Sequence, residues 1–435
     1  MKFQVPRGTR DILPSEAEIW QRLEASARCV FHRYNYREIR TPIFESTDLF
    51  TRSVGESTDI VRKELYTFQD RKGRSLTLRP EGTAPVVRSF LEHAMATPWA
   101  TRLYYMGPMF RYERPQAGRY RQFWQIGAEL LGSASPIADA EMIDLFVSII
   151  RDFGPETVTV QLNSLGDATC RPVYRERLKS YFSDHRAELC GDCVERLQTN
   201  PLRILDCKVP SCRPIINNAP SVLDSLCPQC LDHFSEVKSA LSSLGIVFEV
   251  DPKLVRGLDY YTRTVFEVHA PGLGAQDAVG GGGRYDQLVK ELGGPDTPAI
   301  GFSIGMERLV MASRTVHTVG AAYGDMEERP TVWIVSRTPK AGNEAISLAK
   351  IMRGEILARK GNLRVDFDVS ARSESSQKKS ANTLGAKWII LVPAEGKLYT
   401  VRNMSSGDEQ TMELPSLVGW LLRQTNGSSQ VSSLS

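Results

Sequence analysis

Hydrophobic residues recur at two spacings along the first part of the chain, one typical of helices and one of strands. Over residues 15–34 the spacing is helical, with Ser15 and Glu18 placed as a capping box and Asn35 suited to a left-handed exit. Shorter apolar runs bounded by turn residues predict strands. These runs lie at 36–44, with a break at Pro42, and at 76–80, 101–113, 123–132, 157–162, 259–269 and 299–304.

The predicted strands are too closely interspersed with hairpins for a series of βαβ units. They predict instead an α+β fold with an antiparallel sheet, in a first domain over residues 1–325. Residues 167–240 interrupt this pattern with cysteines, prolines and short helical stretches. We interpret them as a helical insertion into the domain.

A change of spacing marks a second domain. Residues 314–330 have little apolar periodicity and predict a linker. A small α/β domain is then expected over 330–425, with strands at 332–335, 363–367, 387–392 and 398–402 and helices at 341–359 and 374–384. The Ser-rich residues 426–435 predict a disordered tail.

Composition and charge narrow the function only slightly. Of 435 residues, 41% are hydrophobic and 24% charged, which excludes a collagen-like or wholly disordered chain. No apolar run approaches the roughly 18 residues of a membrane helix. Because the first residues contain no apolar signal region, we expect a cytoplasmic protein without membrane contact. Residues 330–425 contain 14 basic and 9 acidic residues, a net charge of +5, whereas the whole chain has a net charge of +3. This local positive charge fits either a polyanionic partner or a solvated basic face.

Residues 110–130 form the most informative segment, a predicted hairpin with an arginine-rich tip. Strand alternation puts Gln125, Gly127 and Glu129 on one face of the second strand. Arg111 shares a face with a glutamate two residues later, and its planar guanidinium suits a phosphate. A salt-bridged hairpin in solvent is the alternative. The central glycine disfavours that alternative, because it allows a flat ligand to approach the backbone.

Three further features place polar residues beside strands. Glu81 ends a strand and could bind a substrate ammonium, while Thr83 could cap the helix that follows. Arg256 precedes two tyrosines at the start of another strand. The four successive glycines at 280–283 favour either backbone contact with a ligand or a flexible turn.

A serine hydrolase is suggested by one motif and disfavoured by its context. Residues 301–309 contain the G-x-S-x-G spacing around Ser303. The only later histidine is His317, and the only acid between them, Glu307, is too near in sequence for the usual triad. The chain also lacks the P-loop and the G-x-G-x-x-G pattern of dinucleotide sites.

Together these segments resemble the class II aminoacyl-tRNA synthetases, and among them the histidyl-tRNA synthetase family, over nearly the whole chain. The first helix and the strand with Pro42 resemble motif 1, the hairpin around Arg111 motif 2, and residues 301–309 motif 3. The family-specific resemblance lies in residues 6–11, 254–262 and 278–286, and more loosely in an anticodon-binding domain at 331–425.

The resemblance implies ATP with Mg²⁺ as cofactors and assigns residues to ATP. Arg111 would hold the α-phosphate, Glu113 would meet the adenine amino group, and Arg308 would hold the γ-phosphate. Arg256 would lie at the α-phosphate and the substrate carboxylate. Arg111 and Arg256 are therefore the predicted catalytic residues.

The same resemblance assigns residues to the amino acid. Those implied to bind the histidine ammonium are Glu81, Thr83 and Gln125. Those implied to read the imidazole are Glu129, Tyr260 and Tyr261.

The implied reaction joins L-histidine to its tRNA through histidyl-adenylate. The resemblance also implies a homodimer that contacts the acceptor stem and anticodon arm of tRNA. The alternative is a non-catalytic, histidine-sensing regulatory subunit of ATP phosphoribosyltransferase, which resembles the same catalytic core. That paralogue typically lacks the C-terminal domain and often loses the motif arginines, so Arg111, Arg256 and Arg308 favour the enzyme.

Six of the eight cysteines lie between 190 and 230, which favours reduced thiols or metal ligands over disulfides. Two C-x-x-C pairs are the usual source of a tetrahedral zinc site, and these are Cys190 with Cys193 and Cys227 with Cys230. Cys207 or Cys212 could replace one ligand. The alternative is a set of structural thiols. Zinc is favoured because so small an insertion is expected to lack a core of its own.

Overall fold

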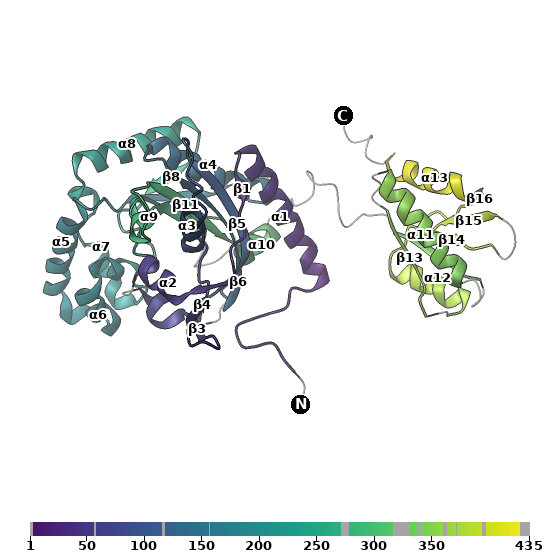
Figure 1. The fold of residues 1–435 in the computed structure, drawn as a ribbon, viewed down its shortest axis with the longest axis horizontal. Helices are drawn as coiled ribbons and strands as arrows, with labels where there is room; N and C mark the ends of the chain where they lie inside the picture. The colour runs from purple at the N-terminus through teal and green to yellow at the C-terminus, as the bar shows by residue number, and fades with distance from the viewer. Residues whose placement is uncertain are drawn as a thin grey trace. The chain divides into compact units, whose positions relative to one another are not determined.

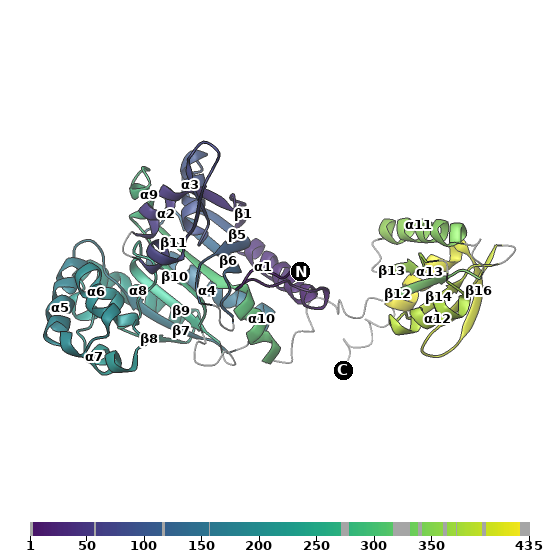
Figure 2. The same cartoon turned by 90° about the horizontal axis from the view of Figure 1, so that it is seen from below.

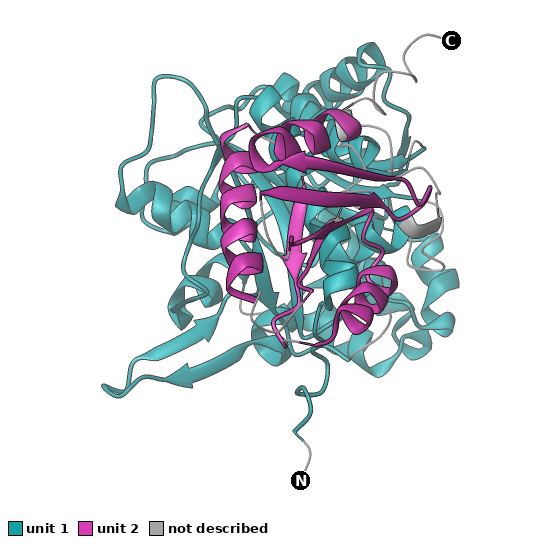
Figure 3. Cartoon of the chain, turned by 90° about the vertical axis from the view of Figure 1, so that its right-hand side faces the viewer, with its two compact units in different colours: residues 1–319 teal, residues 320–435 magenta. Residues whose placement is uncertain are grey.

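The computed structural model describes residues 3–55, 58–114, 118–155, 157–270, 278–315, 331–337, 342–359, 363–370, 372–393 and 397–426. The chain forms two compact units, residues 1–319 and 320–435 (Figure 3). The expected linker beyond residue 315 and the expected tail beyond residue 426 lie outside the described residues. Among the described helices, none is both long and apolar enough to cross a membrane.

An eight-stranded sheet forms the centre of the first unit. Its strands, in spatial order, are β1 (Arg37–Glu38), β5 (Thr101–Phe110), β6 (Gln122–Leu131), β11 (Ala299–Gly305), β10 (Ala278–Arg284), β9 (Thr262–His269), β7 (Thr159–Ser164) and β8 (Phe248–Val250). The pairs β1–β5 and β7–β8 at the two edges are parallel, and the pairs between them are antiparallel. The predicted α+β fold with an antiparallel sheet is therefore confirmed, with a parallel pair added at each edge.

The four successive glycines lie inside this sheet, in β10. Of the two alternatives, the flexible turn is wrong, because Gly280 to Gly283 pair with β9 on one side and β11 on the other. A Cβ at Gly281 would lie 3.0 Å from the Arg256 guanidinium, and one at Gly283 would lie 2.9 Å from the Tyr261 ring. The absence of side chains thus lets residues of another segment lie directly on the strand.

One face of the sheet is covered by helices and the other by the elements of the candidate site (Figures 1 and 2). The covering helices share the largest apolar core and are α1 (Pro14–Arg33), α4 (Pro136–Phe153), α8 (Pro228–Ser243) and α10 (Met306–Thr315). The opposite side carries α2 (Thr47–Val54), α3 (Thr83–Glu92), α9 (Leu288–Glu291) and a π-helical turn at Ile60–Glu64. A three-stranded sheet accompanies them, with the order β2 (Phe44–Ser46), β4 (Ser75–Leu78) and β3 (Tyr66–Gln69).

The first helix differs at its start from the sequence prediction. Helix α1 begins at Pro14 with Leu13 as its N-cap, and no side chain caps it. The expected capping box of Ser15 and Glu18 is wrong, because proline at the first helical position already presets the backbone and has no N–H to satisfy. The expected left-handed exit is confirmed at Asn35, whose φ is 59°.

The break at Pro42 separates two strands rather than interrupting one. The segment before it forms β1 in the large sheet, and the segment after it forms β2 in the small sheet. Proline cannot donate to a strand ladder, so the chain leaves one sheet here and joins another.

The insertion contains α5 (Arg171–Asp184), α6 (Gly191–Thr199) and α7 (Arg213–Asn217), which gather at one side of the first unit (Figure 1). Short 3-10 turns lie at Arg186–Glu188, Pro201–Asp206, Pro210–Cys212 and Leu223–Ser225. The expectation that the insertion lacks a core is wrong. Tyr174, Leu178 and Phe182 are buried together with Cys193 and Cys212 in a separate apolar cluster.

The second unit is a small α/β fold, as the spacing predicts. Its five-stranded sheet has the order β13 (Arg364–Phe367), β12 (Thr331–Val335), β14 (Trp388–Leu391), β15 (Leu398–Asn403) and β16 (Glu409–Glu413). Helices α11 (Gly342–Ala358) and α13 (Leu414–Asn426) share one apolar cluster, and α12 (Glu374–Thr383) contributes to another. The prediction from spacing did not include β16 and α13.

A buried ion pair joins the large sheet to α4. Arg284 on β10 and Asp139 on α4 are both fully buried, and Nη2 of the arginine lies 2.6 Å from Oδ1 of the carboxylate. The same guanidinium donates to the carbonyl oxygen of Ser133 at 2.9 Å. Arg284 also pairs with Asp286 at 2.9 Å, so loss of Asp139 would leave a fully buried guanidinium with one acid fewer to compensate it.

We expect Asp139→Ala to lower the free energy of unfolding by about 3–5 kcal/mol, as for other broken buried pairs. The matched control is Glu355→Ala, which breaks the exposed Glu355–Arg359 pair and should change the free energy of unfolding by less than about 1 kcal/mol. Urea denaturation of both variants provides the measurement. Equal, small effects would contradict the structural role of the buried pair.

Candidate active site

Glu81 organises the start of α3. Its carboxylate accepts hydrogen bonds from the backbone N–H of Thr83 at 2.6 Å and of Ala84 at 2.9 Å. The capping role expected of Thr83 is therefore filled by Glu81, and the Thr83 hydroxyl donates elsewhere, to Glu129 Oε1 at 2.7 Å. Burial raises the pKa of Glu81, against the opposing effect of these backbone hydrogen bonds.

Glu129 is the most deeply buried acid of the site. Besides the Thr83 hydroxyl, the phenol of Tyr285 donates to its Oε2 at 2.5 Å. A Cβ on the neighbouring strand at Gly301 would collide with this carboxylate, so the glycine provides the space that Glu129 occupies. Burial raises the pKa of Glu129 to about 8, although the hydrogen bonds from Tyr285 and Thr83 oppose the shift.

Three tyrosines lie beside this carboxylate. The ring centroids of Tyr260 and Tyr261 are 4.8 Å apart, and Tyr260 meets Tyr285 edge to face at 5.7 Å. All three phenols are buried, and burial raises their pKa values. At neutral pH they therefore remain neutral groups that can both donate and accept hydrogen bonds.

Arg256 brings a partly buried cation to the same face of the sheet. It forms an ion pair with Glu267 on β9. Its Nε atom is buried and has no hydrogen-bond partner among the described residues. The site thus holds a cation that is compensated on one side and has a donor left for an anionic ligand.

The alternation predicted along β6 is confirmed. Gln125, Gly127 and Glu129 face the site, whereas Ile126 and Ala128 are in the helical core. Gln125 Nε2 donates to Ser303 Oγ at 3.3 Å, while its Oε1 is buried without a partner among the described residues. Gly127 leaves room for the Tyr105 ring, which lies where a Cβ would be. A buried acceptor is thereby left for a ligand.

Cations occupy the rim of the site. The Nε atom of Arg111 donates to the carbonyl oxygen of Pro80 at 2.8 Å, which fixes the guanidinium beside the start of α3. Glu113 lies 3.9 Å from Arg111 and 3.6 Å from Arg119. The Nη1 atom of Arg308 donates to the carbonyl oxygen of Ala278 at 2.5 Å. The arginines can bind phosphate oxygens next to a site whose interior is acidic.

Ser303 is not a hydrolase nucleophile. It lies within β11, paired with Gly281 on one side and Gly127 on the other, rather than on a strand-to-helix turn. Glu307 instead accepts hydrogen bonds from the backbone N–H of Trp124 at 3.0 and 3.2 Å. His317 lies outside the described residues. Residues 301–309 therefore form part of β11, which pairs with β10 and β6, and the start of α10.

The predicted histidine-binding residues contact one another through three further residues to which the sequence assigned no role in the site. Tyr285 joins Glu129 to Tyr260, Glu267 fixes Arg256, and Ser303 contacts Gln125. Tyr285 and Ser303 lie inside motifs that were noticed but were given no role. No local signal marked Glu267, because its partner Arg256 precedes the strand on which it lies.

The helical insertion contacts the segment that holds Arg256. Arg203 donates to the carbonyl oxygen of Arg256 at 3.0 Å, and Asn200 donates to Asp259 at 2.9 Å. Arg196 pairs with Asp59 at 2.8 Å. Arg256 is therefore positioned from the insertion as well as from the sheet.

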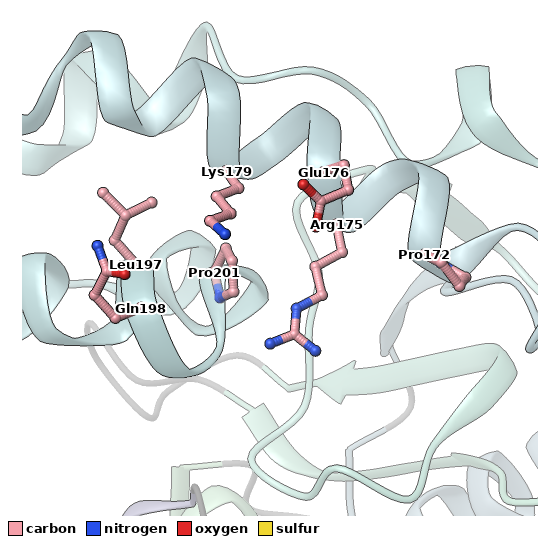
Figure 4. Close-up of a pocket in the computed structure, with 7 residues that line it drawn as sticks. All are labelled: Pro172, Arg175, Glu176, Lys179, Leu197, Gln198 and Pro201. Carbon is pink, nitrogen blue, oxygen red and sulfur yellow. The ribbon is translucent and has the colours of Figure 1, made fainter.

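A hollow on the insertion lies between α5 and α6 (Figure 4). Its lining residues are Pro172, Arg175, Glu176, Lys179, Leu197, Gln198 and Pro201. None of the predicted site residues lines it.

The two C-x-x-C pairs do not form one site. Within the described residues, Cys190 and Cys193 lie with Cys207 and Cys212, with ligand atoms all within 4.8 Å of one another. Cys227 and Cys230 lie in a second such group with Asp167 and Cys170. The predicted set of four ligands from the two pairs is therefore wrong, because the fold brings each pair together with two other side chains.

Comparison with known proteins finds one family over most of the chain. The family model described as histidyl-tRNA synthetase matches residues 8–309. The histidine–tRNA ligase of Desulforamulus reducens is 46% identical over 97% of this chain and 99% of its own. The apo histidyl-tRNA synthetase structure from S. aureus has a TM-score of 0.78 at 38% identity, covering 96% of this chain and 99% of its own.

A more distant structure is similar in fold alone. It is described as an ATP phosphoribosyltransferase regulatory subunit/histidyl-tRNA synthetase from Bacillus halodurans. Its TM-score is 0.64 at 22% identity, with 91% of this chain and 100% of that chain covered.

The raised pKa of Glu129 predicts a pH effect on stability. Because the folded chain keeps this proton up to a pKa of about 8, while an unfolded glutamate loses it near pH 4.5, the stabilisation is complete at low pH. It is lost as the pH rises through about 8. Relative to Glu129→Gln, the wild type should lose up to about 4 kcal/mol of unfolding free energy between pH 5 and 8.5. Denaturant titrations of both proteins at each pH test this, and parallel curves would contradict it.

Proposed function

The chain belongs to the histidyl-tRNA synthetase family and is an aminoacyl-tRNA ligase that charges tRNA with histidine, and we propose that the site described above forms histidyl-adenylate. The observation that carries the proposal is the buried Glu129 carboxyl, held by Thr83 and Tyr285 beside Tyr260. A buried carboxyl group surrounded by phenols can form a hydrogen bond with an imidazole N–H and rejects side chains that cannot form one.

The histidine would lie with its ring toward Glu129, Tyr260 and Tyr261. Its ammonium would meet Glu81, Thr83 and Gln125. The unpartnered Oε1 of Gln125 supports this assignment, because a buried acceptor without a donor is costly unless a ligand supplies one. Arg256, with a buried donor to spare, would hold the substrate carboxylate.

ATP would bind at the cationic rim. We assign its α-phosphate to Arg111 and Arg256, its γ-phosphate to Arg308 and its adenine amino group to Glu113. Rigid support of Arg111 by the Pro80 carbonyl favours this role, since a preorganised cation needs no reorganisation during reaction. ATP would be bound with Mg²⁺, which takes phosphate oxygens as ligands and further neutralises their charge.

The first step would join two anions. A carboxylate oxygen of histidine attacks the α-phosphorus, and the bond to the leaving pyrophosphate breaks. No proton moves, so no general base is needed, and the arginines act by positioning and by stabilising charge. In the second step the terminal ribose hydroxyl of tRNA attacks the histidyl carbonyl and gives up its proton, and the bond between the carbonyl carbon and AMP breaks.

We assign the anticodon arm of tRNA to the basic second unit and the acceptor stem to the first. As domains we propose residues 1–325 for catalysis, with the insertion at 167–240, and 330–425 for anticodon binding. Arg353, Arg364 and Arg402 are exposed cations on three different elements of the second unit. Such groups suit contacts with phosphates.

A homodimer and a cytoplasmic location complete the proposal. The small sheet exposes apolar rings, with Phe44 and Phe68 51% and 44% exposed and 6.3 Å apart. Exposed aromatic pairs of this kind favour a protein interface. The regulatory-subunit alternative is less favoured, because the described arginines of the rim and of the Arg256 segment are all present.

A structural zinc is proposed at the first cysteine group. Cys190 is the N-cap of α6 and Cys193 lies in its first turn. The Sγ atoms of Cys190 and Cys207 are 3.8 Å apart, close to the separation of about 3.8 Å that two thiolates have around a tetrahedral zinc with bonds of about 2.3 Å.

Replacing Arg256 or Arg111 with Ala should slow histidine-dependent ATP–pyrophosphate exchange by about 100- to 1,000-fold, the scale of losing one preorganised donor. Arg71→Ala, an exposed arginine in the turn between β3 and β4, serves as control and should leave exchange unchanged. Near-normal exchange in folded Arg256→Ala protein would refute the assignment. No exchange in the wild type would favour the regulatory subunit.

A chain ending at residue 329 should still form histidyl-adenylate, because the apolar clusters of the two units share no residues. It should charge tRNA about 10-fold more slowly or worse, since cationic contacts to phosphates are lost. Exchange and charging assays, run in parallel on the full and shortened chains, separate the two steps. Equal charging by both chains would show that the second unit has another role.

A further inference from the structure

The strongest unassigned feature is the group of ligand atoms at the root of the insertion, where the chain leaves the large sheet and returns to it. Its members are Asp167, Cys170, Cys227 and Cys230. Cys170 is the N-cap of α5, and Cys227 is the N-cap of α8. The start and the end of the insertion therefore meet at this group.

We propose that this group is a second zinc site, distinct from the one assigned to Cys190, Cys193, Cys207 and Cys212. It offers three thiols and one carboxylate. Thiolate-rich sets select zinc over hard cations, and four such ligands complete a tetrahedral, closed site of the structural kind.

The distances fit a single ion. Cys170 Sγ lies 3.6 Å from Asp167 Oδ1, and Cys227 Sγ lies 4.0 Å from the same oxygen. A thiolate at about 2.3 Å and a carboxylate oxygen at about 2.0 Å from a tetrahedral zinc are about 3.5 Å apart. An iron–sulfur cluster would require its ligands to surround several metal atoms, which a group this compact does not allow.

The local backbone is arranged around the sulfur atoms. Gly166 has a φ of 67°, and a Cβ there would collide with Cys170 Sγ. The backbone N–H of Asp167 donates to that sulfur at 3.3 Å. N–H donors and helix N-termini stabilise thiolates, the form that binds metal.

The site would also position the histidine-binding tyrosines. Arg263 on β9 pairs with Asp167 at 3.4 Å, and its N–H donates to the carbonyl oxygen of Gly166 at 2.8 Å. Arg171, the residue after Cys170, donates to the carbonyl oxygen of Tyr261 at 2.9 Å. A metal that fixes the start of α5 would therefore position Tyr261 through two contacts, that of Arg171 with the Tyr261 carbonyl and that of Arg263 with Asp167.

Metal analysis of the full-length protein, purified without a metal-binding tag, tests the proposal. We expect about two zinc ions per chain, falling to about one in Cys230→Ser and to about one in Cys193→Ser. Cys29→Ser, at the exposed cysteine of α1, should retain both. A wild type with about one zinc that Cys230→Ser retains, or with iron in its place, would overturn the second site.

A gain of ligand sulfur gives a test that does not depend on removing a ligand. In cobalt-exchanged protein, Asp167→Cys should keep both metals and increase the thiolate-to-cobalt absorption, because the proposed second site would then have four thiolate ligands. An unchanged spectrum would show that residue 167 is not a ligand. Since metal content is measured without any aminoacylation, failure here would leave the proposed function standing.

Discussion

The structure depends on the burial of ionisable side chains against a sheet whose neighbouring positions are glycine. Gly301 leaves the space that the Glu129 carboxyl occupies, and a Cβ at Gly281 would press against the Arg256 guanidinium. Burial of either group costs free energy unless partners compensate it, and Thr83, Tyr285 and Glu267 supply that compensation. If the proposed site is correct, the same contacts set both selectivity and stability.

The polarity of the site is divided in a way that suits two different substrates. Its interior holds acids and phenols, whereas its rim holds Arg111 and Arg308. An ammonium and an imidazole fit the former, and phosphates fit the latter. Arg256 lies beside the tyrosines of the interior, yet it is positively charged like the arginines of the rim. In the proposed mechanism it therefore acts where the two substrates react.

The insertion is part of this arrangement rather than a separate addition. Arg203 contacts the backbone of Arg256, and Arg171 contacts the backbone of Tyr261. Each arginine belongs to the insertion that contains the two groups of side chains able to hold a metal ion. Metal-stabilised folding of the insertion would consequently also fix the segment that carries Tyr260 and Tyr261.

The sequence by itself determined the elements whose signal is local. The period of two along β6 put Gln125 and Glu129 on one face, and the change of spacing near residue 330 separated a small α/β unit. Only the tertiary structure decided which distant residues meet. Thr83 donates to Glu129 across 46 positions of chain, and each C-x-x-C pair joins ligands that its spacing did not indicate. Local periodicity fixes the direction in which a side chain points, but the packing of remote segments fixes its partner.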